Sequence, residues 1–399
     1  MHKLSITDFD FENKKVLMRV DFNVPLKEDG SISDDTRIKA AIPSIKYVLD
    51  HGGSVILMSH LGRPKGVTNP KFSLSPCQER LSELLDMPVI LAPDVIGEKV
   101  EVLVNSLKPN QVMLLENLRF YKAEENPKTD PSFAKSLAKL GDIYINDAFG
   151  TAHRKHSSTY TIAQYFPNKS AAGFLMEKEI KFLGAALKNP KKPFYAIIGG
   201  SKISTKTGVI MNLLNKVDGL FIGGGMTYVF LKAQGINIGK SIVENDMIEV
   251  AKNILQQCKE QNIDLNLAED IVIADDFNND AHTRIINSKD GIPDNWEGMD
   301  TGPKTIEKWT EKLKKAQTIL WNGPLGVFEL PSFAKGTYSL ARELANVAAT
   351  TIVGGGDSVA GINSLGLADK FTHLSTGGGS SLEYIEFGHL PGIDALSDK

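Results

Sequence analysis

Short apolar segments alternate with longer amphipathic stretches along this chain. In the first half the apolar segments are residues 16–20, 55–58, 112–115 and 143–145. Between them lie helical patterns such as residues 36–42 and 81–85, in which apolar positions recur every three or four residues. Buried strands that alternate with amphipathic helices are typical of βα units around a parallel sheet.

The second half of the chain repeats this pattern. Its strand candidates are residues 194–198, 220–222, 271–274, 318–320, 350–353 and 371–374. With 399 residues the chain is longer than one hydrophobic core usually organises. We therefore expect an α/β fold with two doubly wound parallel-sheet (Rossmann-like) domains.

A candidate boundary between the domains lies at residues 173–188. Apolar residues at helical spacing predict an amphipathic helix there, and Asn189-Pro190 would end it. We expect a first domain at residues 1–172, an interdomain hinge helix at 173–188 and a second domain at 189–379.

Glycines follow five of the strand candidates in the second half. They are Gly199-Gly200, Gly223 to Gly225, Gly323, Gly354 to Gly356 and Gly377 to Gly379. In an open parallel sheet, the loops at the carboxyl ends of the strands line the ligand crevice. Glycine there lets backbone N–H groups approach an anion, and a following helix adds its positive end. The pattern predicts a phosphate-binding edge.

Composition narrows the choice of partners. A formal net charge of −3 gives no reason to expect nucleic acid or an anionic membrane surface. No apolar run approaches membrane-spanning length, and the first residues lack a signal-peptide core. Two cysteines, Cys77 and Cys258, make neither a disulfide framework nor a zinc site by themselves. We expect a cytoplasmic protein.

Three well-known sequence motifs of nucleotide-binding proteins are either matched only in part or missing from this chain. Residues 235–241 resemble a Walker A loop but lack its first glycine, and helical residues precede them where the motif requires a strand. Residues 147–150 and 153–155 echo protein-kinase triplets without the spacing of that fold. No G-x-G-x-x-G occurs, which disfavours a dinucleotide-dependent dehydrogenase.

The segment from Gly199 to Lys206 is the most informative. Two glycines after a strand, followed by Ser and Thr at N-cap positions, predict the start of a helix. Lys202 and Lys206 would project from one face of its first turns, where cations oppose the helix dipole. A multiply charged anion above them would explain their placement. The alternative is an ordinary capped helix with solvated lysines.

Two acidic residues near the other glycine turns could also contact a nucleotide. Glu329 could accept hydrogen bonds from a ribose, although a structural turn that ends in a solvated glutamate would look the same. Asp357, after Gly354 to Gly356, either caps a helix or ligates Mg²⁺ beside a phosphate, and these roles are compatible.

The first half carries polar and basic residues at the ends of separate strands. These are Asp21, Asn23, His60, Arg63, Arg119 and Arg154. One exposed arginine is normally a solvated or ion-paired surface residue. Several at one sheet edge suit a small acidic substrate that carries phosphate, because arginine stays ionised and binds bidentately. A non-catalytic nucleotide-binding protein would leave this set unexplained.

Taken together, these segments resemble phosphoglycerate kinase. The matching blocks are residues 19–26, 59–64, 115–120, 146–154, 199–206, 321–329 and 354–358. They occur in the family's order and span nearly the whole chain. One departure is visible: Gly-Gly-Ser-Lys-Ile-Ser-Thr-Lys stands where the family usually has Gly-Gly-Ala-Lys-Val-Ser-Asp-Lys, so the local hydrogen bonding of Thr205 is open.

The resemblance implies reversible transfer of the acyl-phosphate of 1,3-bisphosphoglycerate to MgADP, which yields 3-phosphoglycerate and ATP. It maps the triose site onto Asp21, Asn23, Arg37, His60, Arg63, Arg119 and Arg154. It maps the nucleotide site onto Lys202, Lys206, Asn322, Glu329, Gly355, Gly356, Asp357 and Ser358, with Asp357 toward the metal. It also implies a monomer, and a tail at 380–399 that packs back on the first domain.

The chemistry of this reaction requires little acid–base catalysis. The attacking group in the ATP-consuming direction is a carboxylate, which is ionised at neutral pH. Positioning and charge neutralisation are what the phosphoryl group needs. We assign Arg37 and Lys206 to the transition-state oxygens, one from each domain, and expect in-line transfer in a closed interdomain cleft.

Overall fold

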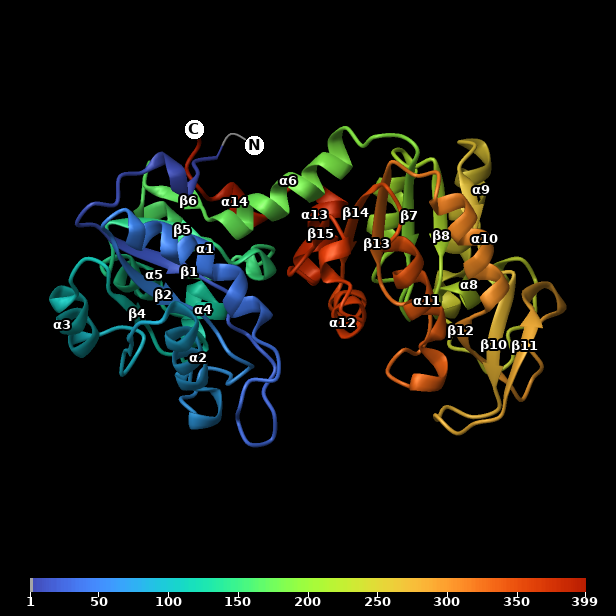
Figure 1. Ribbon diagram of the computed structural model, residues 1–399, viewed down its shortest axis with the longest axis horizontal. Coiled ribbons are helices and arrows are strands. Elements are labelled where there is room, and N and C mark those ends of the chain that lie inside the picture. Colours follow the sequence, from blue (N-terminus) through green and yellow to red (C-terminus); the bar gives the residue numbers. More distant parts are fainter. Residues whose placement is uncertain (1–2) are drawn as a thin grey trace. The chain divides into compact units, whose positions relative to one another are not determined.

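The computed structural model describes residues 3–399, which form two compact units (Figure 1). The first unit contains the chain up to Lys181 together with His389–Lys399, and the second contains Phe182–Gly388. Helix α6 (Phe174–Lys188) carries the chain from one unit to the other. It begins one residue after the predicted start at 173 and ends at the predicted 188.

The first unit is built on a six-stranded sheet in the order β3-β4-β2-β1-β5-β6, in which every pairing is parallel. The strands are β1 (Lys15–Arg19), β2 (Ser54–Met58), β3 (Val89–Leu91), β4 (Val112–Leu114), β5 (Ile143–Asn146) and β6 (Ser170–Ala172). All residues of β2, β4 and β5 are buried, as expected for strands covered on both faces. The predicted parallel sheet of this half is confirmed.

Besides the first turns of α6, six α-helices belong to the described part of the first unit. They are α1 (Thr36–Asp50), α2 (Ser75–Leu85), α3 (Glu98–Ser106), α4 (Lys122–Glu125), α5 (Ser132–Ala138) and, near the C-terminus, α14 (Pro391–Asp394). In α1 the buried residues Ile38, Ala41, Ile45 and Val48 recur at helical spacing and join the core between helix and sheet.

The second unit contains another all-parallel sheet, in the order β15-β14-β13-β7-β8-β9. Its strands are β7 (Phe194–Ile198), β8 (Gly219–Ile222), β9 (Asp264–Asn266), β13 (Thr318–Asn322), β14 (Thr350–Gly354) and β15 (His373–Leu374). The register pairs Asn322 with both Ile198 and Gly354, and pairs Ile198 with Ile222. The glycine turns that follow these strands therefore share one edge, as predicted.

The helices of the second unit are α7 (Thr207–Leu214), α8 (Met226–Ala233), α9 (Ile248–Glu260), α10 (Pro303–Leu313), α11 (Lys335–Leu344), α12 (Gly356–Ser364) and α13 (Gly379–Phe387). Trp321 is fully buried, and the rings of Phe221 and Trp309 meet edge to face in the same core. Helix α8 occupies the place where a Walker A loop would need a strand, so the rejection of that motif is confirmed.

One predicted strand lies in a different sheet. Residues 271–274 belong to β10 (Asp270–Ala274), the central strand of an antiparallel sheet with β11 (Thr283–Asn287) and β12 (Glu297–Thr301). Four of the five residues of β11 are exposed, so this sheet turns one edge to solvent, which antiparallel sheets tolerate. The apolar run of β10 was correctly predicted as a strand, but its local pattern did not reveal its partners.

The predicted C-terminal tail at 380–399 belongs to the first unit only from His389 onward. Helix α13 packs on α7, and Asn212 Nδ2 donates to the Glu386 carbonyl at 2.9 Å, so residues 380–388 stay with the second unit. From His389 onward the chain lies on the first unit, where the Gly392 N–H donates to the Ala152 carbonyl at 2.8 Å.

Among residues 3–399, no helix combines the length and the apolar composition needed to cross a membrane.

Glycine at position 199 is required by close backbone packing. A Cβ atom there would lie 2.2 Å from the Pro324 carbonyl oxygen, which backbone geometry holds in place. We expect Gly199→Ala to lower the free energy of unfolding by about 1–3 kcal/mol. All three tryptophans lie in the second unit, so denaturation followed by tryptophan fluorescence reports on it alone. Gly356→Ala, where a Cβ meets nothing within 4 Å, is the matched control; equal stability of the two variants would contradict the packing argument.

Candidate functional site

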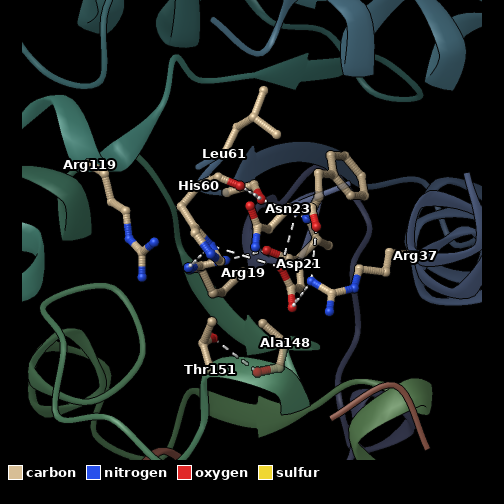
Figure 2. Close-up of polar contacts among 12 residues, drawn as sticks. Arg19, Asp21, Asn23, Arg37, His60, Leu61, Arg119, Ala148 and Thr151 are labelled. Atoms are coloured by element: carbon tan, nitrogen blue, oxygen red, sulfur yellow. Dashed lines mark hydrogen bonds and ion pairs between the residues drawn. The ribbon is translucent and has the colours of Figure 1, made fainter. Parts of the chain in front are cut away.

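The predicted triose residues of the first unit lie in loops at one edge of its sheet. Parallel pairing places the last residue of β1, Arg19, beside Met58 of β2 and Asn146 of β5. The loops that follow these strands and β4 carry Asp21, Asn23, His60, Arg63, Arg119 and Arg154. Figure 2 shows five of the predicted residues together at this edge: Asp21, Asn23, Arg37, His60 and Arg119.

Arg37 is held at this edge from the first turn of α1. Its Nη1 donates to the Asp21 carboxylate at 3.1 Å and to the Asn23 carbonyl at 3.0 Å. Asn23 Oδ1 in turn accepts from the Gly62 N–H at 2.8 Å, which ties the loops after β1 and β2 together. Arg37 keeps 35% of its side chain exposed, so it can still meet a ligand.

The other arginines differ in how firmly they are held. Arg119 is 4% exposed; its Nη1 donates to the Gly62 carbonyl at 2.7 Å and its Nη2 lies 3.2 Å from Glu125. Arg154 Nε donates to His153 Nε2 at 3.0 Å. Arg63 is exposed and makes no hydrogen bond or ion pair within residues 3–399, so its whole guanidinium fork faces solvent.

Three histidines accompany the arginines, and all are neutral at pH 7. Burial, followed by the charge of nearby arginines, lowers the pKa of His60 well below its usual value. Burial likewise lowers the pKa of His153 to about 4 and that of His156 to about 3. The three histidines therefore add no positive charge to this edge at pH 7, whereas its arginines keep theirs across the physiological pH range.

Two charged residues beneath this edge were missed by sequence reasoning. Arg19 ends β1 with 1% exposure, and Glu124 of α4 is fully buried. Their nearest charged atoms lie 3.9 Å apart, and Ser158 bridges them by accepting from Arg19 Nε at 2.8 Å and donating to Glu124 at 2.6 Å. The available signal was an arginine inside an apolar strand, which requires a buried counter-charge.

In the second unit, a cavity of about 200 Å³ lies at the glycine-lined sheet edge. Its lining includes the predicted residues Lys202, Lys206, Asn322, Gly355 and Asp357. Lys202 and Lys206 lie in the loop after β7, Asn322 is the last residue of β13, and Gly355 and Asp357 lie in the turn after β14 and the first turn of α12. The ends of these strands are adjacent in the sheet. Five predicted residues from the ends of three neighbouring strands and the segments that follow them thus line one cavity.

Lys206 is the most deeply placed cation of this cavity. Its ammonium group donates to Asn322 Oδ1. Burial lowers the pKa of Lys206 to about 8, and the charge of Asp357 partly opposes that effect. The ammonium group is therefore still largely protonated at pH 7. Because burial destabilises its charged form, an anionic ligand beside it would stabilise that form.

The predicted helix start at Ser201 is wrong. Helix α7 begins at Thr207, and residues 201–206 form an irregular loop. Glu244, which sequence reasoning missed, accepts hydrogen bonds from the backbone N–H of Ser204 at 3.0 Å and from its hydroxyl, so it holds the loop away from helical geometry. Lys202 and Lys206 consequently line the cavity from a loop instead of one helix face.

Thr205, the position that departs from the family's usual sequence, has a local hydrogen bond. Its hydroxyl donates to the Lys202 carbonyl at 2.9 Å. The threonine therefore stabilises the loop that carries both lysines and does not bring an additional charge to it.

A second cavity, of about 430 Å³, adjoins the first and shares Gly200, Ser201, Pro324 and Asp357 with it. Its lining is mainly apolar and includes Glu329. Mostly apolar walls with a few polar groups are typical of nucleoside and cofactor sites. Glu329 is exposed at this wall, so the ligand-contacting role stays a prediction beside the solvated turn.

The turn after β14 leads into a helix as expected, but Asp357 does not cap that helix. Gly355 has φ of 93°, a backbone conformation that favours glycine, and α12 begins at Gly356. No side chain caps this helix, so the exposed carboxylate of Asp357 remains available at the cavities. Ser358 is fully buried, and its Oγ accepts from the Gly323 N–H at 2.9 Å, so its side chain braces the neighbouring turn and does not line the cavity.

Comparison with known proteins agrees with this geometry. The family model described as Phosphoglycerate kinase matches residues 6–387. Phosphoglycerate kinase 3, cytosolic, of Arabidopsis thaliana is 53% identical over 397 residues, which cover 99% of this chain and 98% of that protein. The solved phosphoglycerate kinases of Coxiella burnetii and Pyrococcus horikoshii superpose with TM-scores of 0.87 and 0.85 at 40% and 34% identity, and each match covers 99% of this chain and 98% of the other. This chain belongs to the phosphoglycerate kinase family.

Proposed function

We propose that this chain catalyses the reversible transfer of the acyl-phosphate of 1,3-bisphosphoglycerate to ADP, which yields 3-phosphoglycerate and ATP in glycolysis. Membership of the phosphoglycerate kinase family supports a phosphotransferase with a carboxyl group as acceptor. The proposal depends mainly on one observation: the first unit has an arginine-rich edge, and the second unit has a lysine- and glycine-lined cavity. Each suits one of the two phosphorylated substrates.

The triose ligand is assigned to the first unit, where its anionic groups would meet the exposed fork of Arg63 and the guanidinium groups of Arg37, Arg119 and Arg154. Arg37 and Arg119 are already held by Asp21 and Gly62, so little side-chain entropy is lost when they bind. Asn23 and His60 complete the assigned set.

The nucleotide is assigned to the second unit. Its phosphates would meet Lys202, Lys206, Asn322 and the backbone of the turn at 355–358, and its ribose would meet Glu329. Mg²⁺ usually binds to proteins through one or two carboxylates plus substrate phosphates. Asp357, exposed at both cavities, fits that donor chemistry and would hold the ion, which supplies charge neutralisation when bound.

The bond changes balance without a protein acid or base. An oxygen of the ADP β-phosphate forms a bond to the phosphorus as the bond to the acyl oxygen breaks, and 3-phosphoglycerate leaves as an ionised carboxylate. What remains for the protein is to hold the two reactants in line and to neutralise charge on the equatorial oxygens. Arg37 and Lys206 are the cations assigned to this task.

Residues on two units can act on one phosphoryl group only when the catalytic arrangement brings both of them to it. We propose that the helix at 173–188, observed as α6, is the hinge of a domain closure. Small-angle scattering with 3-phosphoglycerate and an ATP analogue together should show compaction that neither ligand produces alone. An unchanged radius of gyration with both bound would count against the hinge.

A coupled assay tests the function most directly. Formation of ATP from 1,3-bisphosphoglycerate and ADP is expected, with no nicotinamide-dependent activity in the absence of coupling enzymes. Omission of magnesium should abolish turnover, and restoring it should recover the rate. A protein that binds ADP tightly but forms no ATP would instead support the non-catalytic nucleotide-binding alternative.

The pKa of Lys206 predicts how nucleotide binding depends on pH. Because its pKa is lowered to about 8 by burial, Lys206 loses its charge as pH rises through 8, whereas a bound phosphate would keep it protonated. The Kd for ADP, measured by calorimetry, should increase by up to about tenfold per pH unit above 8. Lys206→Arg is the matched control, because guanidinium stays ionised and the same rise should be absent. A wild-type Kd that is flat from pH 7 to 9.5 would contradict the contact.

We further propose a cytoplasmic monomer that does not use nucleic acid or a membrane as a partner. Both cysteines are buried and free, which suits a reducing compartment, and the net charge of −3 offers no general attraction to polyanions. Sedimentation velocity should give a single species of the chain's mass, 43.6 kDa, at micromolar concentration. A concentration-dependent shift to a dimer would overturn the monomer.

A further inference from the structure

The imidazole ring of His60 forms a hydrogen bond with the buried guanidinium group of Arg19. Arg19 and His60 are in contact in Figure 2, and Arg19 Nη2 lies 3.2 Å from His60 Nδ1. Both side chains are at most 5% exposed. A guanidinium group has N–H donors and no acceptor, so Arg19 must donate in this contact. Nδ1 of His60 is therefore the acceptor and carries no proton.

This contact decides where the proton of His60 is. A neutral imidazole has one protonated nitrogen, so the proton lies on Nε2. Within residues 3–399, Nε2 forms no hydrogen bond. His60 thus has an N–H donor left over at the arginine-rich edge.

Arg19 is fixed by contacts on its other nitrogens. Its Nη1 donates to the Val20 carbonyl, and its Nε donates to Ser158 Oγ at 2.8 Å. Ser158 is itself anchored on Glu124, through its backbone N–H at 3.0 Å and its hydroxyl at 2.6 Å. Every side chain of this set is at most 1% exposed, so none of them can contact the substrate directly.

We propose that Arg19 is a positioning residue that keeps His60 as the neutral Nε2–H tautomer, so that His60 donates a hydrogen bond to the triose anion. Glu124 and Ser158 supply the buried counter-charge and the bridge that hold the guanidinium group in place. The ligand part of this inference rests on the proposed function. The tautomer part rests on geometry alone.

A neutral donor suits this edge better than another cation. The charged and titratable groups around His60 are Arg19, Arg37, Arg119, His156 and Asp21, whose Oδ1 lies 3.9 Å from Nδ1. Four of these five are arginines or a histidine, and an imidazolium among them would be strongly repelled. A hydrogen bond from Nε2 to an anionic ligand needs no added charge and does not change with pH near neutrality.

The tautomer can be measured on the intact protein without substrate. Nitrogen NMR of the ¹⁵N-histidine-labelled chain at pH 7, with His60→Gln to identify the signal, should show an unprotonated Nδ1 and a protonated Nε2. A protonated Nδ1, or protons on both nitrogens, would overturn the proposal. This readout is independent of turnover, so it stays separate from any failure of the proposed kinase activity.

Kinetics test the positioning role. The double variant Arg19→Met/Glu124→Gln removes donor and counter-charge together and leaves no unpaired buried ion. We expect its KM for 3-phosphoglycerate to exceed the wild-type value by roughly tenfold at pH 8 and by less at pH 6, where His60, no longer held neutral, becomes protonated. Its KM for ATP should be unchanged. A KM ratio for 3-phosphoglycerate near one, or one that is the same at both pH values, would refute the role; if the variant does not fold, the NMR result decides.

Discussion

Replacement of Lys206 by alanine is expected to lower kcat at least about 100-fold. One preorganised charge aimed at developing negative charge is worth roughly 3–4 kcal/mol in a transition state. Lys206 is partly buried in the cavity between the glycine turns, and Asn322 Oδ1 holds its ammonium group. Steady-state kinetics in the ATP-consuming direction, with the KM values for both substrates, measure the effect.

Lys202→Ala is the informative comparison for this variant. Lys202 lines the same cavity but is exposed at its rim, so its loss should raise the KM for the nucleotide with a smaller change in kcat. Lys252→Ala, which removes a cation from an exposed surface pair with Glu249, controls for net charge. Normal turnover by a folded Lys206→Ala protein would remove Lys206 from the mechanism.

The glycine-lined edge could be predicted from sequence because two local signals coincide there. An apolar run followed at once by glycine indicates both a buried strand and the end at which backbone approaches a ligand. The register of β7, β8, β13 and β14 aligns these ends. The strand at β10 shows the limit of such signals, since an apolar run does not encode which strand it will pair with.

The residues that sequence reasoning missed act through partners distant in the chain. Glu244 fixes the loop at 201–206 from 40 positions away, so Ser and Thr that look like helix caps bond elsewhere. Arg19 and Glu124 are more than 100 positions apart in the sequence, and only the folded chain brings their charged groups to within 3.9 Å. The sequence around one residue does not reveal a side-chain partner that is distant in the chain. Residues at the ends of parallel strands can be predicted, because the parallel pairing brings those ends to one edge of the sheet.

Arg37→Ala is expected to lower kcat by at least about 100-fold as well, by the same electrostatic argument. In the first unit its Nη1 is held by Asp21 and Asn23, while a third of the side chain remains exposed for a ligand. Arg37→Lys keeps the charge but loses the fork, so it should recover only part of the rate. If Arg37 serves only to bind the triose, KM for 3-phosphoglycerate will rise while kcat stays normal, and its assignment to the transition state will be wrong.

A double-mutant cycle tests whether Arg37 and Lys206 act on the same phosphoryl group. Residues that serve one transition state as a unit are strongly non-additive, so the double variant should lose much less than the product of the two single losses. If the two residues act on different targets, the two losses should multiply instead, which predicts a combined loss on the order of 10⁴-fold. Single-turnover measurements at saturating substrates keep binding and product release out of the comparison. Because the cycle measures only free energies, it reports whether both cations neutralise one charge during transfer, whatever arrangement the two units adopt at rest.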